Sequence, residues 1–341
     1  MSKGKKTTLI IALVCVVLGL ILSFGVLASI QFDFTRLNTI QYETNTYSVE
    51  QPFSHLRVEG AECDIRLVPA QGSACRVICA EAEQVSHTVE VRDGTLTVIR
   101  QDQRKWYEQF GFHWGRMEIT VELPQQTYDS LYLKTLSGDI SVPEGFSFSQ
   151  AEVRSTSGRI GYAAATQGSL LLKTTSGDLT ARGLTTENLE ARSVSGDVEL
   201  EQIEAETIIT EAPSGGITIR SAQVRGQVSA ETVSGAIKLE QLNCQSVRAH
   251  ASSGDLRLTS AAAAGPMELK TVSGGIKLEH SDAERLSITS TSGDVSGTLL
   301  TGKLFTTRTT SGTVRVPGST LDAGLCEITT TSGDIRIELL S

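Results

Sequence analysis

A regular series of eleven Ser-Gly pairs runs from residue 137 to residue 333, and it constrains the fold more than any other feature of this chain. Successive pairs lie 19 or 20 residues apart, except for a last spacing of 21. This nearly constant period indicates one supersecondary unit per repeat, with each unit stacked on its neighbours. The glycines of the eleven pairs are Gly138, Gly158, Gly177, Gly196, Gly215, Gly235, Gly254, Gly274, Gly293, Gly312 and Gly333.

The residues around each pair alternate with a period of two. With the Ser numbered 0, position −2 is always small, position +3 is always aliphatic, and −4 and +5 are mostly apolar. This alternation predicts a strand on each side of the pair. Even positions (−4, −2, 0) are expected to face inward before the pair and odd positions (+3, +5) after it. We therefore expect the glycine to adopt a positive φ at a bend, and the hydroxyls at 0 and −2 to hydrogen-bond inside the stack.

A repeat of 19–20 residues fits one coil of a β-solenoid, with coils about 4.8 Å apart. The expected fold is all-β: a single-chain parallel β-helix, taken as right-handed, over residues 131–341. A sandwich or propeller fits less well, because its units are longer or lack such regular columns. Pro213 at −1 lacks an N–H for a ladder bond, so it is either tolerated beside the bend or marks a local defect.

Residues 31–130 lack the Ser-Gly repeat but still alternate as strands, and they are expected to form an irregular N-terminal cap. Residues 55–70 resemble a degenerate coil. Residues 87–100 predict a hairpin that turns at Asp93-Gly94. Residues 116–124 alternate again and predict a further strand.

The first thirty residues carry Lys3, Lys5 and Lys6, no acidic residue, and an uncharged run over residues 7–30. A helix of 24 residues is about 36 Å long, against about 30 Å for the hydrocarbon core of a membrane. We therefore expect a cytoplasmic tail over 1–6, a transmembrane helix over 7–30 and an extracytoplasmic body. The alternative is a signal peptide cleaved after residues 26–28.

The remaining body carries a net charge of −9 minus 3, or −12. Such a charge argues against nucleic acid and anionic lipid as its partners. Its five cysteines are irregularly spaced, and Cys75 and Cys79 would lie about 13 Å apart on one strand face, too far for a disulfide. We expect small buried apolar residues here and no cofactor.

The columns, written L-x-[LI]-x-[TS]-x-S-G-D-[ILV], resemble a widespread bacterial family of unknown function that carries the label "putative adhesin" and is described by its β-strand repeats. The resemblance covers about residues 45–341. It implies the solenoid fold and, in many members, an N-terminal membrane helix. It implies no catalytic residues, since the family has no established activity.

The repeat offers little for catalysis, because each Ser is one of eleven equivalents. His250 and His280, the two histidines in the repeat region, occupy different positions of their coils, so no Ser-His pairing is indicated. A glycan enzyme needs paired carboxylates or a metal site. Asp178 and Asp197 at +2 of neighbouring coils are a weak Ca²⁺ candidate, whereas Asp also simply suits a turn after Gly.

An aromatic cluster between the cap strands holds both tryptophans of the chain. It is either a plug over the end of the core or a contact loop for a membrane interface or a partner. The cluster comprises Trp106, Tyr107, Phe110, Phe112 and Trp114.

The sequence therefore predicts no enzyme but a membrane-anchored adhesion, scaffold or binding module of the bacterial cell envelope, with a glycan or protein partner. The alternative is an accessory component of envelope-stress sensing that acts through a membrane partner; a glycan-active β-helix enzyme comes third. The printed sequence stops soon after the eleventh pair, which predicts an open last coil and end-to-end self-association.

Overall fold

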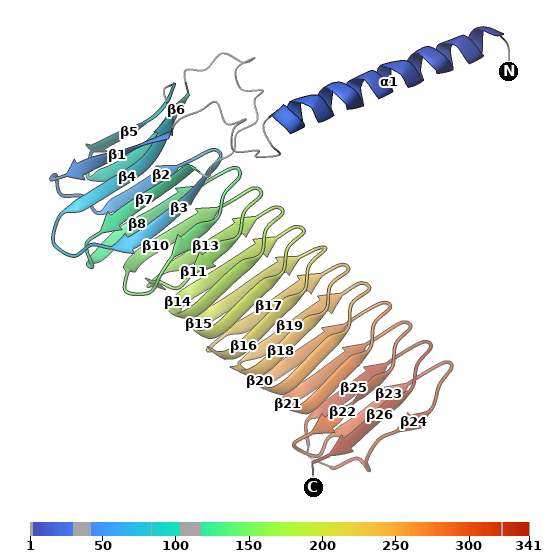
Figure 1. The fold of residues 1–341 in the computed structure, drawn as a ribbon. Coiled ribbons are helices and arrows are strands. Elements are labelled where there is room, and N and C mark those ends of the chain that lie inside the picture. The colour runs from blue at the N-terminus through green and yellow to red at the C-terminus, as the bar shows by residue number, and fades with distance from the viewer. Residues whose placement is uncertain (1–2, 30–41, 83, 103–116, 322, 341) are drawn as a thin grey trace.

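The computed structural model describes all residues except 1–2, 30–41, 83, 103–116, 322 and 341. One helix, α1 (Lys3–Ser29), precedes a long rod of β-strands (Figure 1). No helix within the described residues has both the length and the apolar character needed to cross a membrane. The span expected over residues 7–30 is therefore not supported by the structure.

Parallel strands build the rod, and each pairs with the equivalent strand one repeat later. Ile160 lies beside Leu179, Leu179 beside Val198, and Val198 beside Ile217, so the aliphatic +3 column forms one ladder. The all-β solenoid predicted from the repeat is confirmed. The strands of this part are β8 (Thr127–Lys134), β9 (Ile140–Val142), β10 (Ser147–Arg154), β11 (Ile160–Tyr162), β12 (Ala165–Thr166), β13 (Ser169–Thr174), β14 (Leu179–Ser193), β15 (Val198–Ala212), β16 (Ile217–Val224), β17 (Gln227–Thr232), β18 (Ile237–Cys244), β19 (Ser246–Ala251), β20 (Leu256–Lys270), β21 (Ile276–Thr289) and β22 (Val295–Leu299).

Each central coil bends three times. In the coil that contains β15, alternate residues are buried except at 201–202, 206–207 and 213–214, where two neighbours in a row face outward. The last of these bends is the Ser-Gly bend. The first has a residue with positive φ, for example Gln202 at 55° and Ser221 at 53°. This left-handed bend was not expected from the sequence.

The glycines of the Ser-Gly pairs, here called the corner glycines, do not have the positive φ that we expected. Among the described glycines, only Gly94, Gly145 and Gly183 have a positive φ. Their role is close approach between coils. A Cβ on Gly177 would lie 1.9 Å from the carbonyl oxygen of Gly158, and one on Gly196 would lie 2.0 Å from that of Gly177. A side chain at this position would therefore force neighbouring coils apart.

The serines at position 0 are all exposed, so the expectation that they face inward is wrong. Their place inside is taken by the glycine that follows. The hydroxyls at −2 are buried, with Thr309 in the end coil half-buried, and they hydrogen-bond across the stack as expected. Ser193 Oγ donates to the Gly177 carbonyl at 2.8 Å and accepts from the Gly196 N–H at 2.9 Å.

Replacing Ser193 with alanine should lower the free energy of unfolding by about 1–3 kcal/mol, because the Gly177 carbonyl and the Gly196 N–H both lose a buried partner. Urea denaturation measures the change. Ala212, which already lacks a hydroxyl in this column, shows that the coil itself survives such a loss. A change below about 0.5 kcal/mol would contradict the assigned role of the hydroxyl.

Pro213 is tolerated without a break in the stack. Its carbonyl accepts from Val233 N–H and Ser234 N–H, and Ser214 N–H donates to Val194 across the preceding interface. The ladder thus passes through the residues around the proline and needs no N–H from it.

The N-terminal end combines two more parallel coils with antiparallel strands. β2 lies between β6 and β8, and β3 pairs with β7 and β9, so the degenerate coil predicted over 55–70 is confirmed. The predicted hairpin is also confirmed, with Asp93 and Gly94 both at positive φ in its turn. These strands are β1 (Tyr42–Val49), β2 (His55–Glu59), β3 (Cys63–Pro69), β4 (Cys75–Ala82), β5 (Val85–Arg92), β6 (Thr95–Asp102) and β7 (Met117–Leu123).

The C-terminal coils are stacked out of sequence order. β25 (Leu325–Thr329) lies between β21 and β23 (Leu304–Arg308), and β26 (Ile335–Leu339) lies between β22 and β24 (Val314–Arg315). The eleventh Ser-Gly coil is therefore enclosed, and the expectation that it is the open end is wrong. The end coil of the described stack is β23–β24, where Leu304 and Val314 are exposed.

Candidate functional site

The aspartates of the Ser-Gly-Asp corner hold neighbouring coils together. Asp178 Oδ1 accepts the backbone N–H of Asp197 at 3.0 Å, and Asp197 Oδ1 accepts that of Gly216 at 2.7 Å. The same bond joins Asp255 to Gly275 and Asp294 to Asp334. Within the described part of the chain, the only group of three metal-ligand side chains lies elsewhere and includes neither Asp178 nor Asp197. The geometry thus gives these carboxylates a structural role.

The carboxylate form is the one that this contact favours. The Thr313 N–H donates to Asp334 Oδ1 at 2.7 Å and lowers the pKa of that carboxyl below its usual value. A group with a lowered folded-state pKa stabilises the fold above its unfolded pKa. That contribution is lost as the pH falls through the folded-state value.

Asp178→Asn should be nearly neutral, because an amide oxygen still accepts the Asp197 N–H, whereas Asp178→Ala should cost about 0.5–1.5 kcal/mol. Thermal unfolding of both variants, with and without added Ca²⁺, measures this difference. A Ca²⁺-dependent stabilisation of the native protein that Asp178→Asn abolishes would restore the cation-site interpretation.

One Ser-His contact does exist, outside the repeat. His55 Nδ1 lies 2.7 Å from Ser130 Oγ, and His55 Nε2 lies 3.9 Å from Asp129 Oδ2. The two partners are neighbours in the β2–β8 ladder, and the His55 and Asp129 side chains are substantially exposed. A long, solvated carboxylate contact beside a serine in a regular strand lacks the buried orienting acid of a hydrolytic triad.

Alternating charges cover one outer side of the coils. Arg182 pairs with Glu199 at 3.2 Å, and Arg220 pairs with Glu199 at 2.9 Å and with Glu240 at 3.0 Å. Such exposed pairs contribute little each, about 0–1 kcal/mol. They keep this side polar and strongly solvated.

The Ser-Gly corner, in contrast, exposes apolar side chains at position −1. We call Leu136, Val194, Val233 and Val272 the corner stripe; each is 45–51% exposed. The three valines recur on every second coil, hence about 9.6 Å apart. A groove beside the stripe is lined by Pro213, Val233 and Val272, with His250 and Lys270 among its polar residues. This surface was not predicted from the sequence, although its apolar residues share the −1 column.

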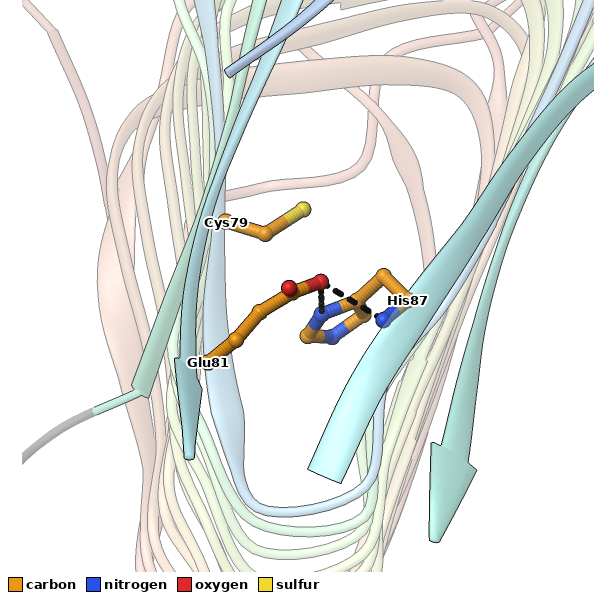
Figure 2. Close-up of side chains that lie close together, drawn as sticks. All are labelled: Cys79, Glu81 and His87. Atoms are coloured by element: carbon orange, nitrogen blue, oxygen red, sulfur yellow. Dashed lines mark hydrogen bonds and ion pairs between the residues drawn. The ribbon is translucent and has the colours of Figure 1, made fainter. Parts of the chain in front are cut away.

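A buried polar cluster lies in the N-terminal cap, where Cys79 and Glu81 of β4 face His87 of β5 (Figure 2). Glu81 Oε1 accepts from the His87 backbone N–H at 2.6 Å and lies 3.0 Å from His87 Nδ1. Burial lowers the pKa of His87. Hydrogen bonds from Asn45, His87 and Tyr47 outweigh burial and lower the pKa of Glu81. This cluster was not predicted from the sequence.

The cysteines of the body are all free and buried, as expected: Cys63, Cys75, Cys79, Cys244 and Cys326. Burial raises the pKa of Cys75, Cys79, Cys244 and Cys326 to about 12 and that of Cys63 to about 11. The aromatic residues 106–114, proposed as a plug or contact loop, lie outside the described residues.

The family model of Toastrack DUF4097 matches residues 53–257 and 227–341, which together make up most of the chain. The chain belongs to this family. A comparison with curated proteins finds no match.

Three solved structures are similar to most of this chain. A putative adhesin of Parabacteroides merdae is 9% identical, with a TM-score of 0.46 over 76% of this chain and 95% of its own. A putative lipid binding protein of Parabacteroides distasonis is 14% identical, with a TM-score of 0.41 over 87% and 97%. A putative adhesin of Bacteroides fragilis is 13% identical, with a TM-score of 0.36 over 87% and 97%.

Proposed function

We propose that this Toastrack protein is a non-catalytic binding and scaffold module of the bacterial cell envelope that engages a protein partner along the corner stripe. The observation that carries the proposal is the stripe itself: three valines are exposed on every second coil of a rigid parallel stack, and Leu136 is exposed three coils before the first of them. Isolated exposed apolar residues are common on protein surfaces, but a regular row of them marks an interaction surface.

A non-catalytic role is supported by what the repeated polar residues do. The −2 hydroxyls and the +2 carboxylates are bonded to the backbone of neighbouring coils, as Ser193 and Asp178 illustrate. The stripe is aliphatic rather than aromatic, which favours a protein surface over the face of a sugar ring. Glycan binding is the second candidate and becomes an outcome of the test below.

The test is a pull-down with the immobilised full chain on two materials, isolated cell wall and detergent-solubilised membranes, so that insertion through residues 7–30 does not contribute. A variant with Val194→Ser, Val233→Ser and Val272→Ser should bind at least tenfold more weakly. Its unfolding temperature should stay the same, because these side chains are exposed. Leu300→Ser, which removes an equally exposed apolar side chain away from the stripe, is the matched control and should bind normally. Unchanged binding by the triple variant would refute the stripe, and binding to purified glycan strands alone would favour the second candidate.

The envelope location and the membrane anchor are part of the proposal and rest on the sequence of residues 1–30, with three lysines before an uncharged run. The full chain should sediment with membranes, and a chain without residues 7–30 should not. If both forms stay in the soluble fraction, the anchor is wrong. An accessory role in envelope-stress sensing would then also lose its route through a membrane partner.

End-to-end self-association also stays a proposal, now through the coil β23–β24 instead of the eleventh Ser-Gly coil. Leu304 and Val314 on this coil are exposed, and within the described residues β23 and β24 each pair with a strand on one side only. Light scattering should show a concentration-dependent dimer that Val314→Lys abolishes. A monomer at all concentrations would contradict this part of the proposal.

A further inference from the structure

Three side chains of different donor chemistry converge in the N-terminal cap. A thiol sulfur of Cys79, a carboxylate oxygen of Glu81 and a ring nitrogen of His87 all lie within 4.8 Å of one another (Figure 2). All three residues are buried, with exposed fractions of 0%, 4% and 6%. Among the residues that the structure describes, no other group of three such side chains is so close together.

We propose that Cys79, Glu81 and His87 form a Zn²⁺ site. Zinc is bound in proteins by thiolate sulfur, imidazole nitrogen and carboxylate oxygen, usually as a tetrahedron. A sulfur and a nitrogen donor disfavour Ca²⁺ and Mg²⁺, which take oxygen ligands. Three protein ligands leave one position of the tetrahedron for a water molecule.

The distances are compatible with a tetrahedral ion after small side-chain rotations. Zinc–ligand bonds of about 2.0–2.3 Å place neighbouring ligand atoms of a tetrahedron about 3.3–3.6 Å apart. The Cys79 sulfur, a Glu81 carboxylate oxygen and a His87 ring nitrogen lie within 4.8 Å of one another, so small rotations bring them to these separations. The ligands also come from paired strands, since β4 and β5 are joined at Ala82 and Val85.

The cluster already holds its carboxylate in place. Tyr47 donates to Oε1 at 3.0 Å, and Asn45 donates to Oε2 at 2.5 Å. Such outer contacts orient metal ligands and are typical of zinc sites. His87 Nε2 is buried without a hydrogen-bond partner within the described residues. A buried polar atom normally has a partner, so this nitrogen is available to a bound ion.

Zinc binding requires that the Cys79 thiol loses its proton, since the thiolate is the form that binds a metal. On binding, a sulfur–zinc bond replaces the S–H bond, and the proton passes to solvent.

The experiment uses the tag-free full chain, stripped with a chelator and then given Zn²⁺ or Co²⁺. Elemental analysis after dialysis should find about one zinc per chain, and Co²⁺ should give a sulfur-to-cobalt charge-transfer band. Cys79→Ser and His87→Gln should each weaken zinc binding by at least tenfold. Cys244→Ala, which removes another buried thiol far along the rod, should bind zinc like the native chain.

Zinc should also raise the unfolding temperature of the native chain and not that of Cys79→Ser. A native chain without bound zinc, or without a thiolate–cobalt band, overturns the proposal even if both variants fail to fold. Equal zinc binding by a folded Cys79→Ser overturns it as well. The proposal is independent of the corner stripe, so failure of either leaves the other standing.

Discussion

Gly177→Val is expected to destabilise the folded chain by more than about 4 kcal/mol. The new Cβ would lie 1.9 Å from the carbonyl oxygen of Gly158 and 2.4 Å from its carbonyl carbon. Both atoms are backbone, and the hydrogen bond from Thr174 Oγ1 to that oxygen holds them in place. Urea denaturation followed by circular dichroism measures the loss, and outright failure to fold is consistent with it.

Gly161→Ala provides the matched control in a nearby coil. Its Cβ would meet only the Ile140 carbonyl oxygen at 3.9 Å, an ordinary contact, and Gly161 has no positive φ. The control should change the stability by less than about 1 kcal/mol. If Gly177→Val were as mild as this control, close coil stacking could not be the reason for the repeated glycine.

Lys303→Met should cost about 3–5 kcal/mol, because it leaves the Asp282 carboxylate buried without its counter-charge. Lys303 Nζ lies 2.6 Å from Asp282 Oδ1 and also donates to the Ala283 carbonyl at 2.7 Å. The two side chains are only 5% and 13% exposed. Chemical denaturation measures the change.

The double variant Lys303→Met with Asp282→Leu should recover much of this loss, since no buried charge then remains unpaired. Lys277→Met removes an exposed partner of Glu279 and should cost no more than about 1 kcal/mol. A single Lys303 variant as mild as the Lys277 variant would show that the pair is solvated rather than buried.

The aliphatic columns made the solenoid predictable, because a parallel stack places equivalent residues such as Leu179 and Val198 side by side. The orientation at the bend was not predictable in the same way. The strands on both sides of the bend alternate in the same way whether the chain bends at the glycine or through two successive outward residues such as Val194 and Ser195. The alternation therefore does not tell these two bends apart. The left-handed bend at Gln202 gave little signal, because only one coil has a glycine there, Gly183, and five later coils have other residues at positive φ.

The out-of-order C-terminal coils could not be deduced either. Every coil carries the same columns, so the aliphatic ladder is equally satisfied by Val295 beside Val314 or beside Ile335. The zinc cluster was missed for a different reason. Cys79 and His87 do not have a known metal-motif spacing, and only the tight β4–β5 connection brings them together.

Amide hydrogen exchange at the C-terminal corners tests most directly whether the Ser-Gly-Asp corner joins coils. Thr313 N–H donates to Asp334 and Asp334 N–H donates to Asp294, so Asp334→Ala should speed exchange at Thr313, and Asp294→Ala should speed it at Asp334. NMR of the folded variants resolves the individual amides. Faster exchange at Thr313 in Asp294→Ala, or no local change in either variant, would contradict both the coil order and the structural role of the corner.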